Sequence, residues 1–297
     1  MTHSKADLKL LVERVQELPT IADLGIKILE LASDPDVSIA DLSKAIHQDP
    51  SFAGRILKIA NSPFYGMTRQ VDSLHLAIVV LGLNEVRNIA LGLSLFEAFK
   101  KMNSHALYNR RQFWLHSASC AMVAHILSCK VGMRAKGNDF IAGLLHDMGK
   151  IVIDEYFGEE FSLIYDEVTR SDVPMIEAER QILGESHERV GEWLVDKWRL
   201  PDSLKDAILY HHSLPSMEKA ADVKDQQLAA LAFLAESFCG HHRIGWDGDA
   251  SCSRIEEPRA WELVFSNQDE NSAENISRIL SETFQAYYES VNYIMLI

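Results

Sequence analysis

The sequence lacks the features that mark secreted and membrane-spanning proteins. Its four cysteines, Cys120, Cys129, Cys239 and Cys252, form neither a CxxC pair nor a regular framework, so we expect reduced thiols. No apolar run approaches the roughly 18 residues that a membrane span requires. The N-terminal stretch MTHSKADLKLLVERVQEL alternates charged and apolar residues and lacks the apolar core of a signal peptide. We therefore expect a cytoplasmic protein with no membrane contact.

Positive charge is also scarce. The chain has 29 Lys and Arg against 43 Asp and Glu, and its formal net charge of −14 repels polyanions. Residues 38–61 could form two short helices and a tight turn, as in a DNA-binding helix-turn-helix, with Arg55 and Lys58 on the second helix. This segment has only three basic and two acidic side chains. We interpret it as a core-packing helix pair and expect no nucleic-acid partner.

Strand-like alternation is absent, and apolar residues recur at helical spacing from end to end. The 297 residues are enough for one large or two modest domains. We predict an all-α fold with a helical N-terminal lobe (1–105), a helical bundle (106–245) and a C-terminal helical extension packed on the core (246–297). The expected helices lie at 21–32, 38–47, 51–60, 72–81, 84–100, 113–131, 140–153, 187–198, 226–239, 258–265 and 272–295.

The stretch 140–153, FIAGLLHDMGKIVI, is the center of this organisation. It is apolar on almost every side, and the pattern predicts one helix buried in a core. A buried Asp147 needs a partner to offset its desolvation. Taken alone, the pattern favours an ion pair with Lys150 one turn later over a metal ion.

Several other polar residues lie in segments that look buried. His116 and Cys120 share one face of the helix 113–131, and His125 falls on the opposite face. Cys120 could be a metal ligand, although a small core residue is the simpler interpretation. The helix 187–198 carries His187 on its apolar stripe, with Val190, Gly191, Leu194 and Trp198.

Further along, a short helix from Asp202 runs into His211 and His212. Glu236 interrupts the apolar helix 226–239 and, if buried, also asks for a cation. By contrast, the acidic segment 154–180 is predicted to be a solvated helical face with a turn at 171–174. We also place His241 and His242, in a Gly-rich loop, at the surface.

The residues that are costly to bury come from five successive helices. Five imidazoles and two carboxylates can supply a pair of divalent transition-metal ions, with one carboxylate bridging them. Such a set accepts iron, manganese, nickel or zinc. The whole set favours bound metal over the ion pair, and comprises His116, His146, Asp147, His187, His211, His212 and Glu236.

This order of residues resembles the HD superfamily of metal-dependent phosphohydrolases. The chain is similar to its HD-GYP phosphodiesterase branch at HDMGK (146–150), at SHERVGEWL (186–194) and at His211-His212. The Gly-Tyr-Pro signature of that branch is missing, because SLPSM follows His212.

The N-terminal half resembles the HDOD domain, the HD-related output domain of bacterial signalling proteins. The matching segments are LPTIADLGIKILEL, SIADLSKAIHQDPSFAGRILKIANSPFY and SLHLAIVVLGLNEVRNIAL. The resemblance covers roughly residues 10–240. It implies a helical N-terminal lobe packed on an HD-type helical bundle.

The resemblance also implies roles for the candidate residues. By similarity to the two-metal HD enzymes, His116 and His146 would hold one ion, and His187, His211 and His212 would hold the other. Asp147 would bridge the ions. Lys150 matches the HD-GYP lysine that neutralises substrate phosphate, so Asp147 and Lys150 are the candidate catalytic residues. Glu236 departs from the family pattern, because those enzymes use Asp.

For function, the resemblance implies a bacterial signal-transduction output module that contacts signalling proteins and retains a di-metal centre. One alternative is an active phosphohydrolase or cyclic-nucleotide phosphodiesterase, with a phosphorylated or cyclic-nucleotide ligand. A remote alternative is a nucleic-acid-binding regulator that uses residues 38–61.

Overall fold

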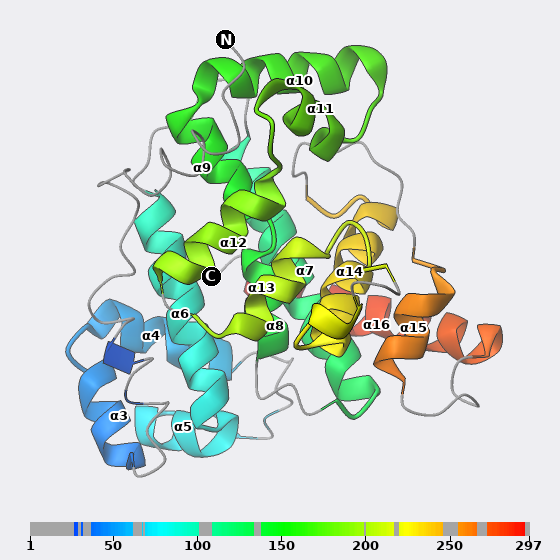
Figure 1. Cartoon of the computed structure of the whole chain (residues 1–297). Helices are drawn as coiled ribbons and strands as arrows, with labels where there is room; N and C mark the ends of the chain where they lie inside the picture. The colour runs from blue at the N-terminus through cyan, green and yellow to red at the C-terminus, as the bar shows by residue number, and fades with distance from the viewer. Residues whose placement is uncertain are drawn as a thin grey trace.

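The computed structural model describes residues 27, 28, 31, 37–61, 67, 69–100, 109–133, 138–198, 200–216, 220–245, 255–265 and 272–294. Over these residues the fold is helical and contains no strand, as predicted. Figure 1 shows a small group of helices, α3 to α5, beside a larger bundle that α6 adjoins.

The N-terminal helices enclose a hydrophobic cluster of their own. They are α3 (Ile39–Ile46), α4 (Pro50–Ala60), α5 (Leu74–Leu81) and the first part of α6 (Leu83–Lys100). Ser38 caps α3, because its hydroxyl accepts from the Asp41 N–H at 3.1 Å. Asp49 caps α4 through the N–H groups of Ser51 and Phe52. The apolar faces of α3 and α4 thus lie in a core.

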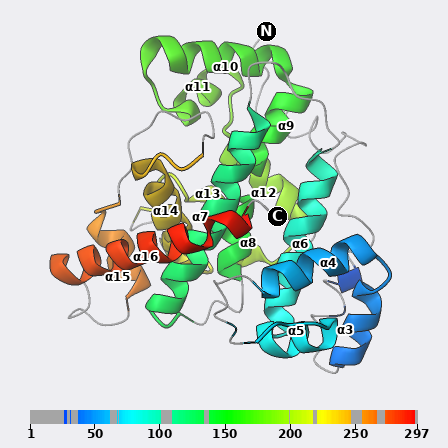
Figure 2. The ribbon, with the colours of Figure 1, turned by 180° about the vertical axis from the view of Figure 1, so that it is seen from behind.

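The larger bundle is built around α7 (Arg110–Lys130), which is buried along most of its length. It packs with α8 (Asn138–Leu145), α14 (Gln226–His241) and α16 (Ala273–Ile294). Figure 2 shows α16 lying across α7. The bundle also includes α9 (Met148–Tyr156), α12 (His187–Lys197), α13 (Asp202–Leu209) and α15 (Pro258–Val264). Trp261, Ile279 and Tyr287 belong to this core, so the C-terminal helices pack on it.

Helix α6 touches both groups. Val86, Ile89 and Leu93 lie in the N-terminal cluster. On the side toward the bundle, a Cβ at Gly92 would lie 2.8 Å from the Leu144 side chain of α8. Close packing of α6 on α8 therefore brings the N-terminal helices against the bundle.

The prediction of one continuous helix over 140–153 is wrong. Helix α8 ends at Leu145, a turn covers His146 and Asp147, and α9 begins at Met148. Asp147 occupies the N-cap position, but its side chain makes no capping hydrogen bond. Its carboxylate instead contacts Lys150 and His211 in the interior. The burial that we predicted for this stretch is confirmed.

The prediction that the acidic segment 154–180 is a solvated face is correct only in part. Helices α10 (Gly158–Ser171) and α11 (Met175–Ile182) form there, with the expected turn between them. However, Asp154 and Glu179 are completely buried. Asp154 pairs with Arg110 at 2.9 Å, and Glu179 pairs with His187. Both acids therefore have structural partners that the composition of the segment did not suggest.

Some predictions fall outside the described residues. These include most of the helix at 21–32, the predicted boundary between residues 105 and 106, and Cys252. Of the described cysteines, Cys120, Cys129 and Cys239 are free thiols, as expected. The three-part division of the chain stays a prediction.

No single helix in the described ranges is long and apolar enough to cross a membrane. One bent pair, Leu74–Leu81 with Glu85–Ser94, passes the same test by length and composition alone, with 116° between its halves.

Candidate metal centre

Three of the candidate imidazoles are held in one tautomer by the backbone. In each, Nδ1 faces a carbonyl oxygen: Gly143 at 2.7 Å from His146, Ile208 at 2.6 Å from His211, and Ile244 at 3.2 Å from His116. A carbonyl oxygen only accepts, so Nδ1 carries a proton. Each Nε2 is then the ring atom that can bind a metal ion in the interior.

His187 is held in the same way by a side chain. Oε2 of Glu179 accepts from the His187 backbone N–H at 2.8 Å and from its Nδ1 at 2.7 Å. Carboxylates in this position orient metal-binding histidines and increase their basicity. Sequence reasoning missed Glu179, although the pattern offered a signal, because Glu179 lies one turn after the buried Met175.

Four residues, which we call the Asp147 group, bring their donor atoms to one point. The group consists of Asp147, His187, His211 and His212. Nε2 of His187 lies 3.2 Å from that of His211 and 3.1 Å from that of His212. Oδ1 of Asp147 lies 3.4 Å from His187 Nε2 and 3.3 Å from His211 Nε2. Ligand atoms about 2.1 Å from one ion lie about 3.0–3.4 Å apart, so this spacing suits a shared ion.

A second set, which we call the Glu236 group, lies on the other side of Asp147. It consists of His116, Cys120, His146 and Glu236. Oε2 of Glu236 lies 2.7 Å from His116 Nε2 and 3.1 Å from His146 Nε2. The extra methylene of Glu, the departure from the family pattern, therefore does not prevent this carboxylate from reaching the histidines.

Asp147 stands between the two groups. While Oδ1 faces His187 and His211, Oδ2 lies 3.5 Å from His146 Nε2. Oδ2 also accepts from Lys150 Nζ at 2.8 Å. The ion pair that we considered as the alternative is therefore present, and it uses one oxygen of the carboxylate. Lys150 is fully buried, and its predicted contact with substrate phosphate stays a prediction.

The electrostatics of the groups follow from burial and close pairing. Burial opposes the ionised form of Asp147, but Lys150 and His146 outweigh it and hold the Asp147 pKa well below its usual range. Burial likewise disfavours protonated His146, but Asp147 and Glu236 raise its pKa to about 9. The Asp147 carboxylate is thus ionised, and without a metal ion His146 offsets it by holding a proton.

The pKa values of three nearby groups, His212, Cys120 and Glu179, are shifted toward the neutral form. Burial, with His211 and His187, lowers the His212 pKa well below its usual value. Burial, Cys239 and Glu236 raise the pKa of the Cys120 thiol well above its usual value. Burial also raises the Glu179 pKa to about 8, against the opposing hydrogen bond from the His187 N–H.

The donor sets fit divalent metal ions. His146 Nε2 and Asp147 Oδ1 are buried and form no well-aligned hydrogen bond with the described residues, although Glu236 lies 3.1 Å from the first and His211 3.3 Å from the second. Leaving such atoms unsatisfied costs about 1–3 kcal/mol each, and a cation would satisfy both. Imidazole nitrogens with carboxylate oxygens are donors that zinc, manganese, iron and nickel accept.

Small residues allow the helices to approach closely enough to form the groups. A Cβ at Gly149 would overlap the carbonyl oxygen of His187, so α9 and α12 meet backbone to backbone. A Cβ at Gly143 would lie 2.5 Å from the Cys120 carbonyl oxygen, so α8 and α7 do the same. These contacts set the distances within both groups.

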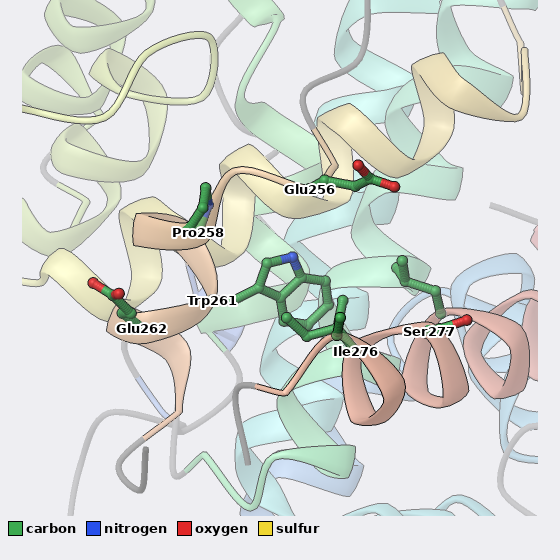
Figure 3. Close-up of a pocket in the computed structure, with 8 residues that line it drawn as sticks. Glu256, Pro258, Trp261, Glu262, Ile276 and Ser277 are labelled. Carbon is green, nitrogen blue, oxygen red and sulfur yellow. The ribbon is translucent and has the colours of Figure 1, made fainter. Parts of the chain in front are cut away.

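A separate cavity of about 450 Å³ lies between α15 and α16. Figure 3 shows Trp261 and Ile276 in its wall, with Glu256 and Glu262 at its edge. None of its lining residues belongs to the Asp147 or Glu236 group. The cavity is therefore not part of the candidate metal centre.

All seven predicted metal-site residues thus lie together in the two groups. His125 belongs to neither group, in line with its predicted place on the other face of α7, and it pairs with Asp139 at 3.1 Å. His241 and His242 are exposed, as predicted. Cys120, left open by the sequence, joins the Glu236 group.

Comparisons with known proteins agree with this architecture. The family model of the HDOD domain matches residues 18–214. A Geobacter sulfurreducens crystal structure, described as an HDOD domain protein with unknown function, is 28% identical. The match covers 98% of this chain and 99% of that one, with a TM-score of 0.80.

Two more distant matches also cover most of this chain. A Shewanella amazonensis structure, provisionally named a phosphohydrolase, is 18% identical to this chain. The match covers 98% of this chain and 99% of that one, with a TM-score of 0.72. A Treponema pallidum protein named only as uncharacterized is 22% identical over 278 residues, or 93% of this chain. The chain spans about half, 51%, of that curated relative's length.

Proposed function

Because this chain belongs to the HDOD domain family, we propose that it is a bacterial signal-transduction output module that retains a metal centre of the HD type. The single observation that carries the proposal is the convergence of two four-residue donor groups, one that contains Asp147 and one whose His146 lies 3.5 Å from Asp147. The module would act in the cytoplasm through contacts with other signalling proteins.

The residues of this chain would divide the work of holding two ions. The Glu236 group would hold one, and the Asp147 group would hold the other. The bound ions would supply positive charge and Lewis acidity. Glu179 and the backbone carbonyl oxygens keep the Nε2 atoms aimed inward, so that binding needs little rearrangement.

The burial of the donors favours a regulatory role over a catalytic one. The Asp147 and His187 side chains are completely buried, and only 14% of the Glu236 side chain is exposed. Structural metal sites have closed ligand sets, whereas catalytic sites keep an open position. Each group here offers four donors, which is a full tetrahedral set.

Elemental analysis of the purified full chain tests the proposal. We expect about two equivalents of transition metal per chain, and less than roughly half an equivalent would overturn it. His187→Gln should lower the metal content. The matched control is His241→Gln, because His241 is exposed and outside both groups, and its metal content should equal that of the unmodified chain.

A second function, metal-dependent phosphoester hydrolysis, is favoured by the position of Asp147. Its two oxygens face opposite groups, and bridging carboxylates of this kind occur in two-metal hydrolases. The names of structures such as the one from Shewanella amazonensis point the same way. In this role Asp147 would hold both ions, and Lys150 would keep the Asp147 carboxylate ionised.

The enzyme function is tested with phosphomonoesters, generic phosphodiesters and cyclic dinucleotides. Hydrolysis by the metal-loaded chain that disappears in Asp147→Asn would support it. Hydrolysis that survives in that variant, or no hydrolysis of any of the three substrate classes, would contradict it and leave the output module.

A further inference from the structure

Cys120 is positioned as a donor and not only as a core residue. It lies one turn after His116 on α7, and both side chains point toward α14, where Glu236 lies. Its Sγ is 3.5 Å from His116 Nε2 and 3.6 Å from Glu236 Oε2. The thiol thus faces the same two atoms that an ion in this group would bind.

The distances agree with tetrahedral coordination that includes sulfur. A sulfur about 2.3 Å and a nitrogen or oxygen about 2.1 Å from a tetrahedral ion lie about 3.6 Å apart. The two measured distances from Cys120 Sγ, 3.5 and 3.6 Å, match this value. Glu236 Oε2 lies 2.7 Å from His116 Nε2, which is a hydrogen-bond distance, so these two atoms would have to move apart to bind one ion.

Charge also favours a thiolate in this group. A buried divalent ion is best offset by two negative ligands, because uncompensated charge is costly away from water. Glu236 supplies one negative charge, and the two imidazoles supply none once they bind metal. Ionised Cys120 would supply the second. In contrast, the Asp147 group has no cysteine and one carboxylate.

Building on the proposed metal centre, we propose that Cys120 is the fourth ligand of the Glu236 group, which makes this position selective for a thiophilic divalent ion such as zinc. Thiolates select zinc over manganese or magnesium, whereas the imidazole and carboxylate donors of the Asp147 group discriminate less. The two positions are then chemically unlike. One is soft and sulfur-containing, and the other takes only nitrogen and oxygen ligands.

Cobalt substitution tests this inference in the full chain, because Co²⁺ bound to a thiolate shows charge-transfer absorption in the near ultraviolet. The metal-free chain is titrated with Co²⁺, and bound cobalt is measured by elemental analysis. We expect the absorption in the unmodified chain and its loss in Cys120→Ser. Zinc affinity of that variant should fall by at least about tenfold.

Cys239→Ser is the matched control. Cys239 is a buried thiol whose proximity raises the pKa of Cys120, but it is outside the Glu236 group. Its replacement should leave the charge-transfer absorption unchanged. Absorption that persists in Cys120→Ser, or that disappears only in Cys239→Ser, would overturn the assignment.

A measurement on the unmodified chain covers the case in which Cys120→Ser does not fold. X-ray absorption of the zinc-loaded chain should show a sulfur neighbour about 2.3 Å from zinc. Bound zinc or cobalt without sulfur coordination would overturn this inference and leave the metal centre standing. Binding of either metal below roughly half an equivalent per chain would overturn both.

Discussion

Glu179 accepts two hydrogen bonds from His187, one from its backbone N–H at 2.8 Å and one from its Nδ1 at 2.7 Å. The same carboxylate therefore fixes the start of α12 and the direction in which the His187 ring points. Because His187 Nε2 is a member of the Asp147 group, Glu179 acts on that group without entering it.

Replacement of Glu179 should weaken metal binding. Glu179→Ala removes the acceptor of the Nδ1 proton, so the ring can rotate or change tautomer. Loss of such an outer partner typically costs about 10–100-fold in metal affinity. Competition titration with a chromophoric chelator measures the change. Glu177→Ala, on the exposed face of the same helix, is the control and should bind as tightly as the unmodified chain.

Asp147 and Lys150 should show a strong energetic coupling in the metal-free protein. Asp147→Asn leaves the buried Lys150 ammonium without its carboxylate, so we expect a loss of about 3–5 kcal/mol in unfolding free energy. Adding Lys150→Met should restore part of this loss. Urea denaturation in chelator measures both variants.

The control for this pair is Asp166→Asn, which breaks an exposed ion pair with Arg170. It should change stability by no more than about 0.5 kcal/mol. A double variant no more stable than Asp147→Asn alone would contradict the coupling.

Gly149→Ala should separate α9 from α12. The new Cβ would overlap the His187 carbonyl oxygen, and backbone atoms cannot yield as a flexible side chain can. We expect a loss of about 1–3 kcal/mol or more in unfolding free energy, together with weaker metal binding. Gly54→Ala in α4 meets no atom within 4 Å and should instead gain about 0.5–1 kcal/mol. Equal effects of the two substitutions would refute the close-approach explanation.

The His125–Asp139 pair should make stability depend on pH. Burial favours neutral His125, but Asp139, Cys129 and Glu85 outweigh it and raise the His125 pKa to about 11. The folded state therefore holds the proton more tightly than the unfolded chain, whose histidine pKa is about 6.5. The stabilisation is complete below that value and is lost as the pH rises toward 11.

His125→Gln should accordingly be most destabilising near pH 6, with a deficit that shrinks by up to about 1.4 kcal/mol per pH unit above about pH 6.5. Denaturation of both proteins from about pH 6 to about pH 9 measures the difference. His241→Gln, in contrast, should give a difference that does not change with pH in this way. A deficit for His125→Gln that grew with pH would show that the sign is wrong.

The sequence predicted the helical fold, and it indicated candidate residues such as His187 and Glu236, for a clear physical reason. Apolar spacing places a residue on a buried face, and a His, Asp or Glu on such a face needs a partner. Both residues lie on segments whose spacing predicts burial. The members from different helices could be grouped only because their order along the chain resembled a known family.

Features that depend on tertiary packing were harder to predict. FIAGLLHDMGKIVI contains no proline, yet α8 ends at Leu145 and the chain turns through His146 and Asp147 before α9 begins. The composition of 154–180 indicated a solvated face, which hid the fact that Glu179 lies on the buried side of α11. Cys120 could not be assigned from spacing, since its distance to Glu236 depends on how α7 meets α14.

The turn between α8 and α9 links the two proposed metal positions directly. His146 belongs to the Glu236 group and Asp147 to the Asp147 group, although they are consecutive residues joined by one peptide unit. A distortion of the backbone there reaches both positions at once, whereas substitutions in α13 or α14 reach one. An ion bound in one group would therefore constrain the geometry of the other group, because a single peptide bond joins His146 to Asp147.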